Sequence, residues 1–222
     1  MKKTVVCIDR DGTLIYDSRE HLFLGQDNDW QQKVEVLPMA VEGTRLLNTI
    51  AGAGIYMITN QAGVAISDFP LLTEERTHEV CRYVVDLLKN NGASLNGYFL
   101  CPHATPEYAS RKPGVNFHSD LVHDCQCFKP ALGMVFNALK TEGITLENAD
   151  VYIIGDRASD VETALNIGGT GILIPFANEP GEEYKVRILE GQGHIHIAEN
   201  MLAAAEFILS HVTRLNTPGA NH

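Results

Sequence analysis

Short apolar runs alternate with segments of helical period along most of the 222-residue chain. A continuous apolar run predicts a strand buried on both faces, and apolar positions that recur every three or four residues predict an amphipathic helix. This pattern predicts strands at 5–8, 55–58, 98–100, 151–154, 172–174 and 195–197. It predicts helices at 38–50, 73–90, 132–139, 161–167 and 201–212. Residues 216–222 are expected to form a flexible tail.

The alternation of strands and helices predicts an α/β fold with a Rossmann-like parallel sheet and helices on both faces. The length fits one domain, which we expect to span residues 1–215. Two long loops, 16–36 and 101–128, show no helix or strand period. Loops of this length in a compact domain usually carry function.

Composition and charge narrow the class of partner. The chain is 45% hydrophobic and 20% charged, as in an ordinary globular protein. No stretch has the length and apolarity of a membrane span, and the N-terminal apolar run is too short for a signal-peptide core. The net charge is −11, and no basic run suggests nucleic-acid binding. We expect a cytoplasmic monomer that acts on a small molecule and binds neither nucleic acid nor membrane.

Four polar clusters are predicted to meet at one edge of the sheet, because ligands of parallel sheets bind at the carboxyl ends of the strands. Three of them follow the first, second and fourth strands, and one opens the helix after the second long loop. They are Asp9-Arg10-Asp11-Gly12-Thr13, Thr59-Asn60-Gln61, Gly155-Asp156-Arg157-Ala158-Ser159-Asp160 and Lys129-Pro130.

Asp9, Asp11 and Asp156 would give an oxygen-rich site of the kind that holds Mg²⁺. Carboxylates alone repel a phosphate, at about 4 kcal/mol for each pair of charges near a protein surface. A divalent ion and Lys129 would reverse that sign, and Thr59 could hold phosphoryl oxygens, which predicts a phosphoryl-transfer site. A lone Asp-x-Asp often caps a helix or faces solvent. Four such clusters in this order favour the catalytic interpretation.

These motifs resemble the four signature motifs of the haloacid dehalogenase superfamily. The resemblance implies that Asp9 is the nucleophile and that Asp11 is first the general acid and then the general base. A carboxylate nucleophile divides hydrolysis into two steps through an aspartyl-phosphate, and both steps need such proton transfers. Two further sets of roles are implied. The phosphoryl group would be bound by Thr59 and Lys129. Mg²⁺ would be held by Asp9, the backbone carbonyl of Asp11 and Asp156, with support from Asp160.

The second long loop carries a separate candidate metal site. Cys101, His103, Cys125 and Cys127 supply three thiolates and one imidazole, a ligand set that favours structural Zn²⁺. The alternative is three free thiols and a surface histidine, but the loop then has few apolar residues to order it. Bound zinc would also fix Lys129, two residues after the last cysteine. The other two of the five cysteines, Cys7 and Cys81, are interpreted as buried small hydrophobes.

With the zinc ligands included, the chain resembles the D-glycero-D-manno-heptose 1,7-bisphosphate phosphatases and the phosphatase part of histidinol-phosphate phosphatases, compact members without a large cap domain. This resemblance implies a Mg²⁺-dependent phosphatase with a zinc-ordered loop, acting on a sugar phosphate such as the heptose bisphosphate. Two alternatives stay open: a histidinol-phosphate phosphatase, and a zinc-ordered scaffold without catalysis. The residues expected to contact substrate are Asn60, Gln61, Arg111, Lys112 and Arg157.

One position departs from the family pattern. Phe128 stands where these phosphatases usually have an arginine that is expected to contact the substrate. The insert 104–124 is also longer than is typical, and Arg111 or Lys112 within it could replace the missing charge. His118 and His123 in the same insert are interpreted as solvated loop residues.

Overall fold

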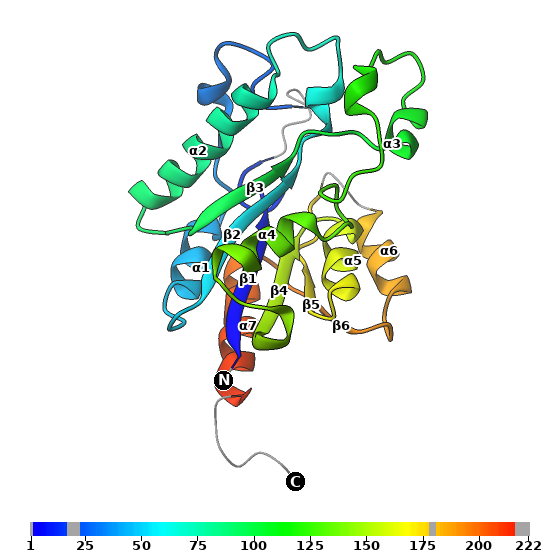
Figure 1. Cartoon of the computed structure of the whole chain (residues 1–222). Coiled ribbons are helices and arrows are strands. Elements are labelled where there is room, and N and C mark those ends of the chain that lie inside the picture. Colours follow the sequence, from blue (N-terminus) through cyan, green and yellow to red (C-terminus); the bar gives the residue numbers. More distant parts are fainter. Residues whose placement is uncertain (1, 17–22, 178–180, 216–222) are drawn as a thin grey trace.

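The computed structural model describes residues 2–16, 23–177 and 181–215, and its sheet is parallel throughout (Figure 1). Its six strands lie in the order β3-β2-β1-β4-β5-β6. They are β1 (Lys3–Asp9), β2 (Gly54–Asn60), β3 (Gly97–Cys101), β4 (Ala149–Gly155), β5 (Thr170–Leu173) and β6 (His194–Ile197). The predicted Rossmann-like sheet is confirmed, with every predicted strand present.

Helices cover both faces of the sheet, as alternate residues of β1 show. Val6 and Ile8 point into a core that includes residues of α1 (Ala40–Leu47), α2 (Glu74–Asn90) and α7 (Met201–Leu215). Val5 and Cys7 point into the opposite core with α4 (Gly133–Thr141) and α5 (Ala158–Asn166). Both faces of the central strand are therefore buried, which explains its continuous apolar run.

Three predicted helices have an end that differs by three residues from the observed one. The first begins at Ala40 and ends at Leu47, within the predicted range 38–50. The helix predicted from residue 161 begins at Ala158, because the side chain of Asp160 accepts a hydrogen bond from the Arg157 amide at 3.2 Å and caps a polar first turn. The last helix continues to Leu215, past the predicted residue 212.

Short helices also occur where the sequence predicts none. In the loop 101–128, α3 (Pro106–Ser110) begins after Thr105, whose hydroxyl accepts a hydrogen bond from the Tyr108 amide at 3.1 Å. Further along the chain, α6 (Glu182–Ile188) buries only Val186, so it has no apolar stripe to reveal it. Within the described ranges, four 3-10 turns complete the elements: η1 (Trp30–Lys33), η2 (Ala62–Ala65), η3 (Ser119–Leu121) and η4 (Leu146–Asn148).

The strand order places the candidate motifs together. β1 pairs with β2 on one side and with β4 on the other, so the carboxyl ends of these three strands are neighbours. The chain crosses to opposite sides of β1 after β3, which makes this edge the topological switch point where α/β sheets bind ligands. The expected tail 216–222 lies outside the described residues, and the single domain 1–215 stays a prediction. No helix in the described part of the chain is both long and apolar enough to cross a bilayer.

Candidate active site

A buried cluster of three carboxylates and one lysine forms at the carboxyl ends of β1 and β4. Lys129 Nζ donates to Asp9 Oδ1 at 2.5 Å and to Asp160 Oδ1 at 2.6 Å. Carboxylate oxygens of Asp9, Asp156 and Asp160 all lie within 4.8 Å of one another. The structure thus brings together four of the predicted site residues, from three segments of the chain.

Asp156 is the carboxylate of this cluster that most needs a cation. Both of its side-chain oxygens are buried without a hydrogen-bond partner among the described residues, and Arg157 Nε lies 4.0 Å from Oδ2. Gly12 has φ +80°, and a Cβ there would lie 2.3 Å from Asp156 Oδ2. Only glycine therefore lets the chain after Asp11 approach this carboxylate. Unpaired hard oxygen ligands beside Asp9 fit a bound Mg²⁺.

The charges of the cluster shift each other's pKa values. Burial raises the pKa of Asp9 to about 7, and the charge of Lys129 offsets this only in part. Burial, with repulsion from Asp9 and Asp160, raises the pKa of Asp156 to about 9. Burial alone would lower the pKa of Lys129, but the carboxylates of Asp160 and Asp9 together raise it. The lysine therefore stays charged, and the carboxylates lack enough positive charge within the protein itself.

Asn60 fixes the backbone that carries Lys129. Its Oδ1 accepts from the Lys129 amide at 2.9 Å, and its Nδ2 donates to the Lys129 carbonyl at 3.2 Å. This reciprocal pair uses both ends of the amide, so Asn60 positions the lysine in this structure. Its predicted substrate contact stays a prediction. Sequence reasoning missed the clamp, because a lone Thr-Asn-Gln is a weak signal.

Asp11 lies beside the cluster and is held from two sides. Arg10 Nη2 donates to Asp11 Oδ2 at 2.9 Å, and Gln61 Nε2 donates to the same oxygen at 2.8 Å. Gln61 Nε2 also donates to Thr59 Oγ1 at 2.7 Å. Gln61 is 2% exposed, so this predicted substrate residue connects the predicted acid to the predicted phosphoryl ligand.

The insert brings aromatic and basic side chains together around Tyr108. The Tyr108 and Phe128 rings are 6.0 Å apart between centroids, and Lys112 Nζ lies 5.1 Å from the centre of the Tyr108 ring. Burial raises the pKa of Tyr108, and the charge of Arg157 lowers it, so these two side chains are close enough to interact. Arg111 instead forms an ion pair with Glu107 on the exposed side of α3, 73% exposed. The structure therefore does not bring Arg111 to the cluster.

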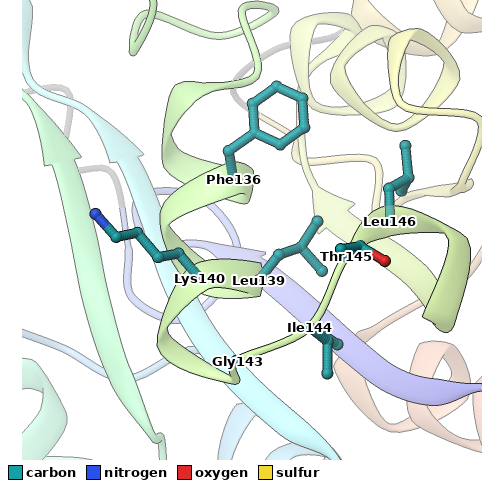
Figure 2. A pocket seen from close by; sticks show the side chains of 7 residues that line it. All are labelled: Phe136, Leu139, Lys140, Gly143, Ile144, Thr145 and Leu146. Carbon is teal, nitrogen blue, oxygen red and sulfur yellow. The ribbon is translucent and has the colours of Figure 1, made fainter.

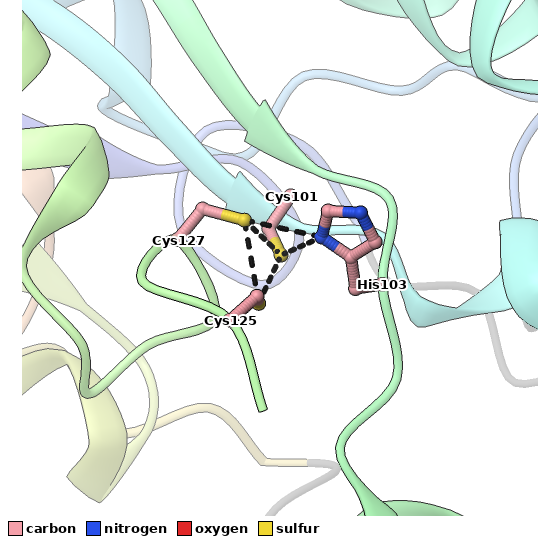
Figure 3. Close-up of side chains that lie close together, drawn as sticks. All are labelled: Cys101, His103, Cys125 and Cys127. Atoms are coloured by element: carbon pink, nitrogen blue, oxygen red, sulfur yellow. Dashed lines mark hydrogen bonds between the residues drawn. The ribbon is translucent and has the colours of Figure 1, made fainter. Parts of the chain in front are cut away.

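The four predicted zinc ligands converge from both ends of the insert (Figure 3). Their ligand atoms all lie within 4.8 Å of one another, although 24 residues separate Cys101 from Cys125. His103 Nδ1 lies 3.3 Å from Cys127 Sγ and 3.7 Å from Cys101 Sγ. The hydrogen bond between Cys127 and Cys101 is the main cause that lowers the pKa of Cys127 to about 5 and raises the pKa of Cys101, so Cys127 is the thiol of this pair that ionises first. The donor set fits tetrahedral Zn²⁺.

The two histidines of the insert lie at the surface, and the two cysteines outside the zinc cluster lie in the core. His118 and His123 are both exposed, and the His123 ring lies 4.5 Å from the His103 ring between centroids. Cys7 and Cys81 are fully buried, as expected.

We expect purified protein to contain about one zinc per chain, and Cys127→Ser to lower zinc content and stability together. Loss of a structural metal is among the changes that cost about 4 kcal/mol or more. In a domain of this size that corresponds to roughly 10 °C in the denaturation midpoint. Metal analysis and thermal denaturation measure both effects, with Cys7→Ala as the buried-cysteine control that keeps its zinc. A zinc-free parent that is as stable as the zinc-loaded protein would contradict the role given to the cluster.

A separate pocket lies at the C-terminal end of α4 (Figure 2). It has a volume of about 390 Å³. It is lined by Phe136, Leu139, Lys140, Gly143, Ile144, Thr145 and Leu146. None of the four polar motifs contributes to it, so it is not part of the candidate active site.

Comparison with known proteins agrees with this geometry. Residues 126–187 match the family model for haloacid dehalogenase-like hydrolases. D,D-heptose 1,7-bisphosphate phosphatase from B. bronchiseptica, solved with magnesium and phosphate, has a TM-score of 0.67 at 22% identity, covering 94% of this chain and 99% of that one. The chain is therefore similar to the haloacid dehalogenase-like hydrolases over residues 126–187. The expected resemblance to this superfamily and the expected α/β fold are thereby confirmed.

Further relatives of this chain are longer proteins. The histidine biosynthesis bifunctional protein HisB of Blochmanniella floridana is 27% identical over 172 residues, which are 78% of this chain and 41% of that protein. HisB of Campylobacter jejuni subsp. doylei is also 27% identical, over 78% of this chain and 42% of its own. The chain thus spans about two fifths of the curated relatives that it matches. D,D-heptose 1,7-bisphosphate phosphatase from Burkholderia thailandensis shares the fold, with a TM-score of 0.56 at 15% identity over 94% of this chain and 99% of that one.

Proposed function

We propose that this chain is a Mg²⁺-dependent phosphatase that cleaves small phosphate monoesters through an aspartyl-phosphate on Asp9. The observation that carries the proposal is the buried cluster itself. Asp9 is 6% exposed, with Lys129 bound to one of its oxygens. The two oxygens of Asp156 have no hydrogen-bond partner in the described structure. A buried nucleophile, a fixed cation and an open set of hard ligands are the parts that phosphoryl transfer requires.

The residues of the chain divide the reaction between them. An Asp9 oxygen attacks phosphorus, the bond from phosphorus to the leaving oxygen breaks, and Asp11 gives its proton to that oxygen. Water then attacks the same phosphorus, Asp11 takes a proton from the water, and the bond to Asp9 breaks to release phosphate. Lys129 and Thr59 hold the phosphoryl oxygens in both steps. Mg²⁺, when bound by Asp9, Asp156 and the Asp11 carbonyl with Asp160 in support, neutralises charge on the phosphoryl group.

Phosphate release from simple monoesters tests the proposal. Turnover should appear with added Mg²⁺ and disappear when Mg²⁺ is omitted from buffer that keeps the zinc in place. A zinc-loaded, folded protein that releases no phosphate from any of a broad panel of phosphorylated metabolites would favour the scaffold alternative.

Free thiols at the zinc cluster are kept in a reducing compartment, which supports the cytoplasm as the location.

Mg²⁺ should stabilise the protein more at about pH 8 than at about pH 6. The pKa values of Asp9 and Asp156, about 7 and about 9, lie above the ordinary value of a carboxyl group. The metal-free folded protein therefore holds protons that the unfolded chain has already released. Its free energy of unfolding falls as pH rises from the ordinary carboxyl pKa through about 7 and about 9. Mg²⁺ must displace those protons, so its affinity rises with pH. Thermal denaturation with and without Mg²⁺ measures this, and Asp156→Asn should remove the Mg²⁺ effect. An equal Mg²⁺ shift at both pH values would contradict this account.

For the substrate, we propose a small phosphorylated metabolite and test two candidates against each other. The resemblance to the heptose bisphosphate phosphatases supports a sugar phosphate, and the match with HisB proteins supports histidinol phosphate. The kcat/KM values for heptose 1,7-bisphosphate, histidinol phosphate and simple sugar monophosphates decide between them.

Phe128→Arg should raise the preference for a bisphosphate over a monophosphate about tenfold to a hundredfold. Phe128 packs against Tyr108 and offers only an apolar face, whereas arginine would add one charge-assisted contact to a second phosphate. Such a contact contributes roughly 1.5–3 kcal/mol. The ratio of kcat/KM values measures the effect, with Phe128→Leu as the control for loss of the ring. A strong bisphosphate preference in the parent that Phe128→Arg leaves unchanged would place the specificity elsewhere.

A further inference from the structure

Arg10 is a fully buried charge next to the proposed catalytic residues, and the reaction described above gives it no role. It is 1% exposed, in a chain whose other arginines are on loops and helix surfaces wherever the structure describes them. A buried guanidinium is costly unless its donors are satisfied. Its Nε and Nη2 donate to Asp11, and its Nη1 lies 3.6 Å from Cys81 Sγ on α2. The guanidinium therefore joins the Asp11 carboxylate to the buried face of a long helix.

The two oxygens of Asp11 are held unequally. Oδ2 accepts from Arg10 Nη2 at 2.9 Å, from Arg10 Nε at 3.2 Å and from Gln61 Nε2 at 2.8 Å. Oδ1 accepts from Arg10 Nε alone among the described residues, at 3.0 Å. Arg10 Nη2 and Gln61 Nε2 occupy the two acceptor sites of Oδ2, whereas Oδ1 has only the shared Nε–H and keeps room for a proton.

We propose that Arg10 is a positioning residue which, together with Gln61, fixes Asp11 so that Oδ1 is the oxygen that exchanges protons during catalysis. This inference rests on the acid and base roles proposed for Asp11. In the first step the Oδ1 proton passes to the leaving oxygen as the bond to phosphorus breaks. In the second step Oδ1 takes a proton from the attacking water. Without the guanidinium the carboxylate can turn about its side-chain bonds, and fewer encounters place Oδ1 correctly.

A series of leaving groups distinguishes positioning from general damage. Arg10→Gln should lower kcat/KM about tenfold to a hundredfold for alkyl phosphates, part of the roughly 10²–10⁴ that acid–base catalysis supplies. The same change should have little effect on acetyl phosphate, whose leaving group departs without a proton. Arg10→Lys keeps the charge but loses the forked pair of N–H donors. Its kcat/KM for alkyl phosphates should therefore lie between those of the parent and of Arg10→Gln. Arg45→Gln is the matched control, because that side chain donates to the Asn91 carbonyl on the surface.

Background variants separate the possible outcomes. In Asp11→Asn protein, Arg10→Gln should cause no further loss on alkyl phosphates. If Arg10→Gln does not fold, Arg10→Lys should show the same selective loss in a weaker form. Equal losses on alkyl and acetyl phosphates in folded variants would overturn the inference. If Asp11→Asn itself does not discriminate between the leaving groups, the proposed acid role fails instead, whatever Arg10 does.

Discussion

Asp9→Asn is expected to abolish phosphatase activity, with a loss of about 10⁴-fold or more, and to leave the fold intact. The amide keeps the shape of the side chain but lacks the charge that attacks phosphorus and that helps to hold the metal. Lys129 keeps its ion pair with Asp160 at 2.6 Å, so one of the two ion pairs of this lysine remains. Phosphate release under saturating Mg²⁺ measures the loss. Denaturation and zinc content verify the fold.

The covalent step can be observed directly. After acid quenching during turnover with a labelled substrate, the parent should carry label that hydroxylamine removes, and the Asp9→Asn protein should carry none. Asp86→Asn, on the exposed side of α2, is the matched control and should behave as the parent. Appreciable turnover by metal-loaded Asp9→Asn protein would exclude the aspartyl-phosphate on this residue.

Asp11→Asn should lower kcat/KM for alkyl phosphates by about 10²–10⁴, the usual contribution of a positioned acid and base. An amide can neither donate a proton to the leaving oxygen nor accept one from water. It can still accept hydrogen bonds from Arg10 and Gln61, so the local structure should persist. The value of kcat/KM reports the first chemical step, and there acetyl phosphate should suffer a much smaller loss. Similar losses for both leaving groups would show that Asp11 has another role.

The sequence by itself determined the order of elements and the position of the chemistry. Continuous apolar runs identified the central strands β1, β2, β4 and β5, because a strand buried on both faces leaves few polar positions. The edge strands β3 and β6 are mostly half-buried, and β6 alternates histidine with isoleucine. Motifs that follow such strands meet at one sheet edge for topological reasons, so Asp9, Thr59 and Asp156 could be placed together without coordinates. Local composition could not reveal α6, since a helix that buries only Val186 has no apolar period. It could not reveal α3 either, a helix of five residues that depends on its Thr105 cap.

Only the tertiary structure decided which side chains hold one another. Asn60 clamps Lys129 across 69 positions of the chain, and Gln61 reaches Asp11 across 50. Arg10 turns inward toward Asp11 and Cys81, although its position in the motif says nothing about direction. Periodicity records burial, which is a local property of the sequence. Hydrogen-bond partners depend on how distant elements pack, and a buried polar group takes whichever partner that packing brings within reach.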